Sequence, residues 1–422
     1  MIKGNRNVLL ILVATSFNFL GNGMHLVAIS WLIYEITKSP LSVAFLVTLQ
    51  WVPGIVSSFF TGSIIDNLNR KYILICMDII RCITVLSLPI LFYSTDSTKV
   101  WVLYAATVII TICSNFFHPA QKAILKEVIP EDIFLRVVSF NSTILQLGAI
   151  VGAGSAGFLI SMYSPYAVFL IDSCTFLISA VLLSFLQYKR LLKRTNHKVR
   201  LSFYKDLKIG ASYLFQRKVL FTLYLMGLIP SLVVKIINSL LSSYTDTSLH
   251  MGVKEYGILD SAFAVGSVVT GLYLVGFVKK GGMESTFYNY SFIGIGLSLL
   301  MLSIFPNYYV AIIGMVILGA TTMFEVVSRR TLVMKSVDEN YMGRVEGFYW
   351  MIVSSVTPLG NIIASFIADF TGSRAVILSY GLIMFIIFVT LFKGGKRNFI
   401  TELTKEVDFN TIRKQKQIES TN

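Results

Sequence analysis

Ionisable side chains inside long apolar segments are the residues of this sequence best placed to do chemistry. A charge in a low-dielectric segment costs free energy unless it is paired or neutralised by a proton. Such groups therefore serve either as structural ion pairs or as sites that bind and release protons. The sequence has seven of them well within apolar runs: His25, Asp78, Arg81, Asp172, Lys235, Asp260 and Glu325.

Several of these residues allow two interpretations. Histidine side chains in general change charge near neutral pH, so His25 either carries a proton or is a hydrogen-bonded histidine of a helix bundle. Glu325 either takes up a proton or pairs with Arg329, one helical turn later. Asp78 and Arg81 are three residues apart on one helix face, which favours a local ion pair.

Lys235 and Asp260 lie in neighbouring apolar runs, within reach of each other across the long lysine stem. As a salt bridge they would only join two helices. As a coupled pair, protonation of Asp260 would release Lys235. Asp369 lies at the outer end of a run, where we expect it to meet water.

The composition shows what must position these groups. With 55% hydrophobic and 14% charged residues and a mean hydropathy of +0.72, the 422-residue chain is too apolar for a soluble protein. Runs of ~20 apolar residues predict transmembrane helices, and their lack of alternation argues against a β-barrel. There are twelve runs: Val8–Tyr34, Leu41–Ile65, Tyr72–Tyr93, Val100–Ala123, Val137–Tyr163, Tyr166–Leu186, Val219–Tyr244, Tyr256–Val278, Ser285–Phe305, Tyr308–Val327, Met342–Phe370 and Ala375–Phe392.

Positive charges predict the orientation. Most of the 36 Lys and Arg residues fall in alternate loops and in the two termini, which places both termini in the cytoplasm of a cell whose plasma membrane the chain crosses. The net charge of +14 is explained by this topology and by attraction to anionic lipids, so we expect no nucleic-acid partner.

The chain divides around a basic stretch. We predict an N-terminal six-helix half (1–187), a basic cytoplasmic linker (188–218), a C-terminal six-helix half (219–392) and a cytoplasmic tail (393–422). A shift of 208 residues aligns Asn115–Phe140 with Met323–Phe348. The fold class is therefore an all-α membrane protein of two pseudo-symmetric halves, with a substrate site between them near the midplane.

A family resemblance rests on motifs that occur in order along the chain. GSIIDNLNRK matches G-x-x-x-D-x-x-x-R-[RK] of the major facilitator superfamily at Gly62, Asp66, Arg70 and Lys71. The chain also resembles the drug/proton antiporter branch that includes macrolide efflux proteins and enterobactin exporters. The further motifs are TKSPL (37–41), D-x-x-R at Asp78 and Arg81, F-x-P-A (117–120) and F-L-x-D-x-x-x-F-L (169–177).

The resemblance implies a secondary active efflux transporter of hydrophobic or amphipathic small molecules, proton-coupled and working by alternating access. Its expected partners are a small-molecule substrate, protons and membrane lipids, with the chain as a monomer. No nucleotide-binding loop occurs in the sequence, and we expect no enzyme activity, cofactor or metal. The alternatives are a dedicated siderophore, peptide or lysolipid exporter, or a non-transporting membrane sensor.

The family motif also implies a conformational latch. In this interpretation Asp66 meets a helix N-terminus or a basic group when the cytoplasmic side closes, and Arg70 and Lys71 hold the loop at the lipid surface or pair with acids. The alternative is that these are solvated loop charges. The latch residues are Gly62, Asp66, Arg70, Lys71, Asp78 and Arg81.

Three further sets complete the candidate site. The coupling candidates are Asp260, Lys235, Glu325, His25 and Asp172. The substrate-cavity candidates are polar residues in apolar runs: Asn18, Asn22, Gln50, Asn115, Asn141, Gln146, Asn238 and Asn361. Small residues in the fifth run predict close helix packing or a direction-setting role at Gly148, Gly152 and Gly157; Ala153 stands where the antiporters of the family carry proline.

Overall fold

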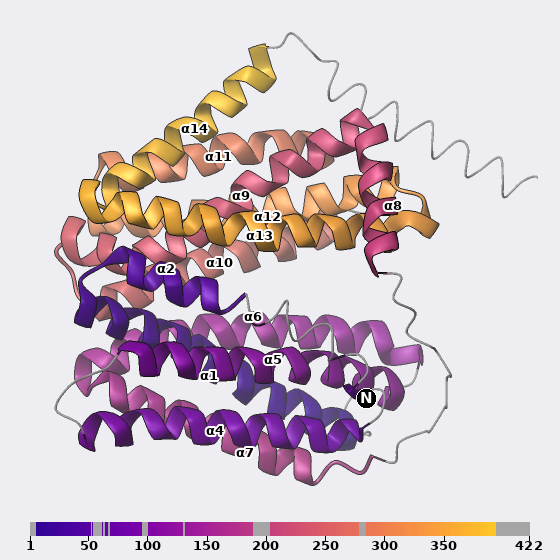
Figure 1. Ribbon diagram of the computed structural model, residues 1–422, viewed down its shortest axis with the longest axis vertical. Coiled ribbons are helices and arrows are strands. Elements are labelled where there is room, and N and C mark those ends of the chain that lie inside the picture. Colours follow the sequence, from indigo (N-terminus) through magenta and orange to yellow (C-terminus); the bar gives the residue numbers. More distant parts are fainter. Residues whose placement is uncertain are drawn as a thin grey trace, which may run out of the picture. The chain divides into compact units, whose positions relative to one another are not determined.

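The computed structural model describes residues 6–51, 53, 61, 64–65, 68–94, 100–129, 131–188, 203–277 and 284–393. Described residues in regular structure are helical (Figure 1). Within this part of the chain, nine helices are long and apolar enough to cross a membrane, and shorter apolar helices accompany them. Helices prevail because in hydrocarbon each backbone N–H and C=O must be bonded within its own segment.

Each predicted run of the N-terminal half contains a described helix. The elements are α1 (Arg6–Thr37), α2 (Pro40–Leu49), α4 (Arg70–Ser94), α5 (Val100–Val128), α6 (Glu131–Met162) and α7 (Pro165–Ser184).

The six runs of the C-terminal half are helical as well, and an additional helix, α8, precedes them. The elements are α8 (Phe203–Gln216), α9 (Lys218–Ser243) with the π-helical turn η2 (Tyr244–Ser248), α10 (Val253–Phe277), α11 (Glu284–Ile304), α12 (Tyr308–Ser336), α13 (Glu339–Thr371) and α14 (Ser373–Lys393).

The predicted repeat is confirmed at the level of whole helices. Helices α5 and α12 begin and end 208 residues apart, and α6 and α13 begin at Glu131 and Glu339, the same distance apart. The sequence shift therefore maps equivalent elements of two six-helix halves onto each other, which is the architecture the apolar runs predicted.

The chain forms two compact units. Unit 1 comprises Met1–Lys193, Asn238–Ala264 and Ser365–Ser373, and unit 2 comprises Arg194–Ile237, Val265–Ala364 and Arg374–Asn422. Because the units interleave along the second half of the chain, the predicted boundary at residues 188–218 stays a prediction.

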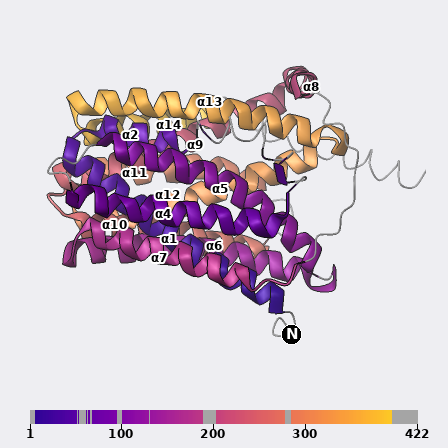
Figure 2. The ribbon, with the colours of Figure 1, turned by 60° about the horizontal axis from the view of Figure 1, so that its bottom comes forward.

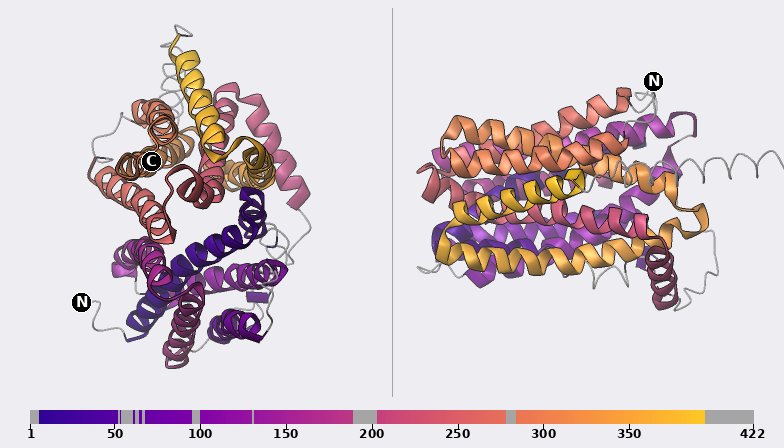
Figure 3. Two further views of the ribbon diagram at one scale, coloured as in Figure 1. Left: turned by 90° about the vertical axis from the view of Figure 1, so that its left-hand side faces the viewer. Right: turned by 90° about the horizontal axis from the view of Figure 1, so that it is seen from above.

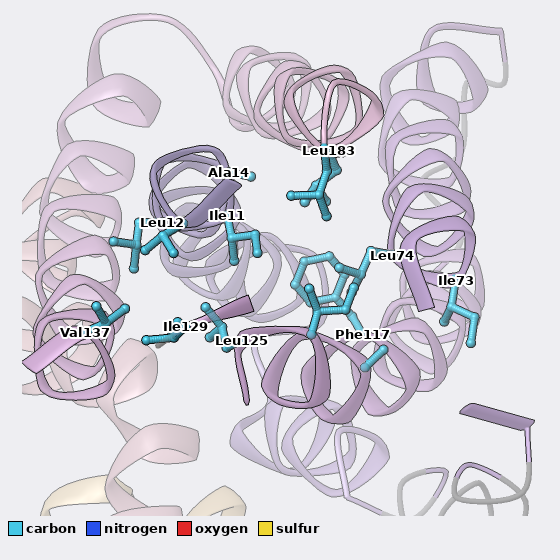
Figure 4. Packing of buried hydrophobic residues seen from close by; sticks show 14 of the residues in the cluster. Ile11, Leu12, Ala14, Ile73, Leu74, Phe117, Leu125, Ile129, Val137 and Leu183 are labelled. Carbon is cyan, nitrogen blue, oxygen red and sulfur yellow. The ribbon is translucent and has the colours of Figure 1, made fainter. Parts of the chain in front are cut away.

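Unit 1 is built around α1. This helix contacts α6, α7, α5 and α2, and α4 packs on α5 and α7. The long helices of the unit run roughly side by side (Figures 1 and 2), and an end-on view places α1 among its neighbours (Figure 3). A cluster of buried side chains that includes Ile11, Leu74, Phe117, Leu125 and Leu183 fills one end of the bundle (Figure 4).

In unit 2, α11 packs on α12, and α8 runs across the direction of α12 and α13 (Figures 1 and 3). The Tyr213 ring of α8 stacks on Tyr341 at 4.7 Å, and its hydroxyl donates to Asp338 at 3.0 Å. Burial raises the pKa of the Tyr213 phenol, so it stays a donor at neutral pH. Gly210 lets α8 approach the backbone of Arg344. Helix α8 is thus fixed to the turn between α12 and α13.

Candidate functional site

A network of polar side chains joins α1, α4 and α7 inside unit 1. Asn18, Asp78, Arg81 and Ser179 are each fully buried. The Asn18 amide donates to Asp78 Oδ1 at 2.8 Å, and Ser179 Oγ donates to Asp78 Oδ2 at 2.6 Å. Arg81 Nη1 donates to Asn18 Oδ1 at 3.0 Å and lies 3.7 Å from Asp78 Oδ1. We call these four residues the arginine layer.

Aromatic rings complete the surroundings of Arg81. Its guanidinium lies 4.6 Å from the ring centroid of Phe117 and 5.3 Å from that of Phe176. Such cation–π contacts stabilise a cation that water does not reach. Since an arginine keeps its charge in proteins, the carboxylate of Asp78 has a permanent counter-charge.

A second acid–base pair joins α1 and α7. His25 Nδ1 lies 3.0 Å from Asp172 Oδ2; Asp172 is fully buried and His25 is 7% exposed. Among the described residues, Asp172 Oδ1 and His25 Nε2 have no hydrogen-bond partner. A Cβ added at Gly21 would lie 2.4 Å from Asp172 Oδ1, so the carboxylate fits only because position 21 lacks a side chain. We call His25 and Asp172 the histidine layer.

The two layers form a ladder between α1 and α7. Asn18 and His25 are seven residues apart on α1, as are Asp172 and Ser179 on α7. Seven residues make two helical turns, or about 10 Å, and bring each pair to the same helix face. The spacing therefore explains why α1 and α7 meet through polar side chains at two levels.

Unit 2 has a simpler buried ion pair. Arg329 Nε donates to Glu325 Oε1 at 2.8 Å, one turn along α12. Of the two interpretations of Glu325, this contact is the ion pair with Arg329. The guanidinium lies 4.8 Å from the ring centroid of Tyr349. A Cβ at Gly227 would lie 2.5 Å from Arg329 Cδ, so this glycine gives the side chain its space.

The remaining coupling candidates, Lys235 and Asp260, belong to different units. Their pairing stays a prediction. In the part of the chain that the structure describes, no three His, Cys, Asp or Glu side chains gather as metal ligands would.

The substrate-cavity candidates differ in their surroundings. Asn361 is fully buried, and within the described residues neither polar atom of its amide has a partner; Asn115 and Asn141 each have one such atom. Asn22 donates to Asn18 Oδ1 at 3.2 Å, and the backbone of Gln50 caps the end of α2. Asn238 is half-buried, and the side chain of Gln146 lies outside the described set. Asn361 is thus the candidate whose amide has the most unused hydrogen-bonding capacity among the described residues.

The predicted latch is only partly described. Gly62 and Asp66 lie outside the described residues. Arg70 forms an ion pair with Glu127 of α5, as expected of a charge that pairs with an acid. Lys71 Nζ donates to the carbonyl oxygens of Ser184 and Leu186 at 2.7 and 2.8 Å, so it caps the C-terminal end of α7.

The small residues of α6 lie at close helix contacts within unit 1. A Cβ on Gly152 would come 2.3 Å from the Leu20 carbonyl oxygen of α1, and one on Gly148 would meet Phe19 at 3.0 Å. A Cβ on Gly157 would lie 3.0 Å from Gly257 Cα of α10. These glycines let backbones approach, and a direction-setting role stays a prediction.

Sequence reasoning missed the hydrogen-bond partners of two acids at the outer ends of the helices in unit 1, Asp369 and Asp246. Asp369 accepts from Ser39 Oγ at 2.8 Å and from the Leu41 backbone N–H at 3.4 Å, so it caps the N-terminus of α2. Asp246 accepts from Tyr34 at 3.0 Å. Asp369 is exposed, as expected of an acid at an outer end, and it has this capping role in addition. The available signal was Pro40 in TKSPL, which marks a helix start.

Buried ion pairs inside apolar helices that can cross a bilayer are typical of multi-pass membrane proteins with a functional site within the membrane. The family model of the Major Facilitator Superfamily matches residues 11–357 and 223–414, so the chain belongs to this superfamily. Its fold and family are those of transporters with small-molecule substrates.

Relatives and solved structures agree with this assignment. The uncharacterized MFS-type transporter YfiS of Bacillus subtilis (strain 168) is 25% identical over 415 residues, covering 94% of this chain and 95% of the relative. Macrolide efflux protein A of Streptococcus pyogenes is 24% identical over 352 residues, covering 82% and 85%. The crystal structure of the nucleoside transporter NupG has a TM-score of 0.73 at 15% identity, covering 92% of this chain and 99% of that one.

Proposed function

We propose that this protein is a secondary active efflux transporter that uses a proton gradient to expel hydrophobic or amphipathic small molecules, of which macrolides are the first to test. The buried His25–Asp172 pair supports proton coupling, because such a pair can bind and release a proton inside the membrane. The similarity to macrolide efflux protein A supports the substrate class.

In this proposal the two halves rock around a central cavity, and a proton moving inward drives the substrate outward. The unpaired amide of Asn361 is a candidate polar contact in an otherwise apolar cavity. The chain works as a monomer in the plasma membrane with both termini in the cytoplasm. An ion gradient is the energy source that fits a chain without a nucleotide-binding loop.

The function is tested with purified protein in vesicles. An imposed pH gradient should drive accumulation of at least one member of a panel that contains a macrolide, a lipophilic cation, a siderophore, a short peptide and a lysolipid. Collapse of the gradient with an ionophore should abolish accumulation. Accumulation of only the siderophore, the peptide or the lysolipid would show that this compound class, and not macrolides, is the substrate. Accumulation that survives the ionophore would contradict proton coupling.

The latch provides a separate prediction for the cytoplasmic loop. Asp66→Asn should slow transport severalfold while leaving insertion and yield intact, because the carboxylate is expected to act in only one conformational state. Transport rates per inserted molecule give the measurement, with Asn67→Asp as a control for charge in the same loop. Wild-type rates for Asp66→Asn would favour the alternative in which these charges are merely solvated.

A further inference from the structure

We propose that the histidine layer, His25 of α1 and Asp172 of α7, is the site where this transporter binds and releases its coupling proton, and that Gly21 positions the Asp172 carboxylate within it. This inference rests on the proposed function and specifies one pair among the coupling candidates.

The argument starts from the counter-charges. Among the described residues, three buried carboxylates form ion pairs: Asp78 faces Arg81 and Glu325 faces Arg329, while Asp172 faces His25. Arginine does not release its proton, so protonation of the acid in either of the first two pairs would leave an uncompensated buried cation. Histidine can be neutral or charged near neutral pH. The histidine layer is therefore the pair that one proton can bring from a negative charge to neutrality.

The proton balance follows from the pair itself. With neutral His25 and ionised Asp172 the layer carries one negative charge. The hydrogen bond between Nδ1 and Oδ2 already holds one proton, so a further proton taken up at Nε2 or Oδ1 makes the layer neutral. Release to the other side of the membrane restores the negative charge. Because the layer is buried away from water, its negative and neutral states differ in free energy. Binding or release of the proton can therefore change how the helices pack.

The free polar atoms point to the same place. Asp172 Oδ1 and His25 Nε2 are buried and lack partners among the described residues, so each can accept or donate a proton without first breaking a bond. The space at Gly21 holds Oδ1, because a methyl group there would come within 2.4 Å of it and within 2.2 Å of Thr175 Oγ1. An alanine at this position must displace the carboxylate.

The titratable groups around the layer belong to several helices. Asp172 interacts electrostatically with two residues of α4, Arg81 and Cys82. Asp78 of α4, Cys113 and His118 of α5 and Cys174 of α7 complete the described set near the arginine layer. Gly148 and Gly152 of α6 lie against α1 and add no charge there. Arg81 thus supplies a constant positive charge, and His25 supplies the variable one.

The test reads the protonation of the pair directly and needs no substrate. Infrared difference spectra of the purified protein in lipid, recorded between acidic and alkaline pH, should contain carboxyl and imidazole bands that change together. Asp172→Asn should remove the carboxyl change and move the midpoint of the remaining imidazole change. Gly21→Ala should move the midpoint of both bands.

The controls separate this effect from general disturbance. Ser173→Ala removes a buried hydroxyl that binds only the carbonyl of Leu170 in its own helix, and Gly347→Ala adds a methyl group with no atom within 4 Å. Both should keep the wild-type bands and midpoint. If Asp172→Asn does not fold, His25→Gln tests the pair from the other side by removing the imidazole change.

Unchanged bands in Asp172→Asn, or the same midpoint shift in Gly347→Ala as in Gly21→Ala, would overturn the assignment. A protein whose pair titrates as described but which transports nothing in the vesicle panel would contradict the proposed function alone. A protein that transports with the proton gradient while Asp172→Asn keeps every band would contradict the histidine layer alone.

Discussion

The buried acids of unit 1 and of unit 2 are held in different ways. In unit 1, Asp78 and Asp172 bind partners on other helices, so their charge is part of the packing of α1, α4 and α7. In unit 2, Glu325 binds Arg329 on its own helix. A charge change across helices alters how those helices fit together, whereas a pair within one helix leaves its neighbours less affected. We therefore place the proposed proton-responsive site in unit 1.

Replacing the buried arginines, Arg81 in unit 1 and Arg329 in unit 2, should give the largest difference in stability between variants of the two units. Arg81→Leu leaves two buried acids, Asp78 and Asp172, without their fixed cation, and should lower the free energy of unfolding by ~3–5 kcal/mol. Arg329→Leu leaves Glu325 alone and should cost less. Chemical unfolding in detergent gives both values.

The double variants sharpen this result. Arg329→Leu with Glu325→Leu should recover most of the lost stability, because an apolar pair can replace an ion pair. Arg81→Leu with Asp78→Leu should recover only part of it, since Asp172 still lacks the field of Arg81 and Asn18 keeps only Asn22 as a side-chain partner. Equal recovery in the two units would break the comparison.

The two glycines beside the charged groups predict a smaller contrast. Gly21→Ala should destabilise the protein by ~1–3 kcal/mol, because the new methyl group meets the short side chains of Asp172 and Thr175. Gly227→Ala should cost less, since the long side chain of Arg329 can shift. Unfolding midpoints give the comparison, with Gly347→Ala as the uncrowded control. A larger loss at Gly227 would contradict it.

Substitutions at the outer end of unit 1 should have the smallest effect on stability. Asp369→Ala removes the carboxylate that caps α2 and should cost ~0.5–2 kcal/mol. Glu35→Ala is the matched control, an exposed acid at the outer end of α1. The same unfolding measurement applies, and a loss for Glu35→Ala as large as that for Asp369→Ala would show that the cap contributes nothing specific.

Much of the fold was predictable, because the apolar runs must be helices in a bilayer and their order repeats. The shift of 208 residues even aligned the ends of α5 and α12. The ionisable residues of the site could also be identified from the sequence, because a charged side chain in an apolar run is costly and marks a candidate site.

The partners were harder to predict. Nothing in the spacing of Asp172 and His25, 147 residues apart, indicates a contact, because it depends on how α1 packs against α7. Gly21 looked like an ordinary helix residue, and its importance comes from the carboxylate beside it. The partners of Asp369 and Asp246 were missed because a carboxylate at the end of an apolar run usually meets water alone, whereas here each also binds another helix.

Transport with and without a proton gradient tests the central claim most directly. Wild type, Asp172→Asn and Glu325→Gln are reconstituted side by side, and accumulation driven by a pH gradient is compared with exchange of substrate at equal pH. Asp172→Asn should retain exchange but fall to the accumulation of protein-free vesicles, while Glu325→Gln should accumulate substrate more slowly and still depend on the gradient. Gradient-driven accumulation by Asp172→Asn at the wild-type rate, with loss of coupling in Glu325→Gln, would contradict the account.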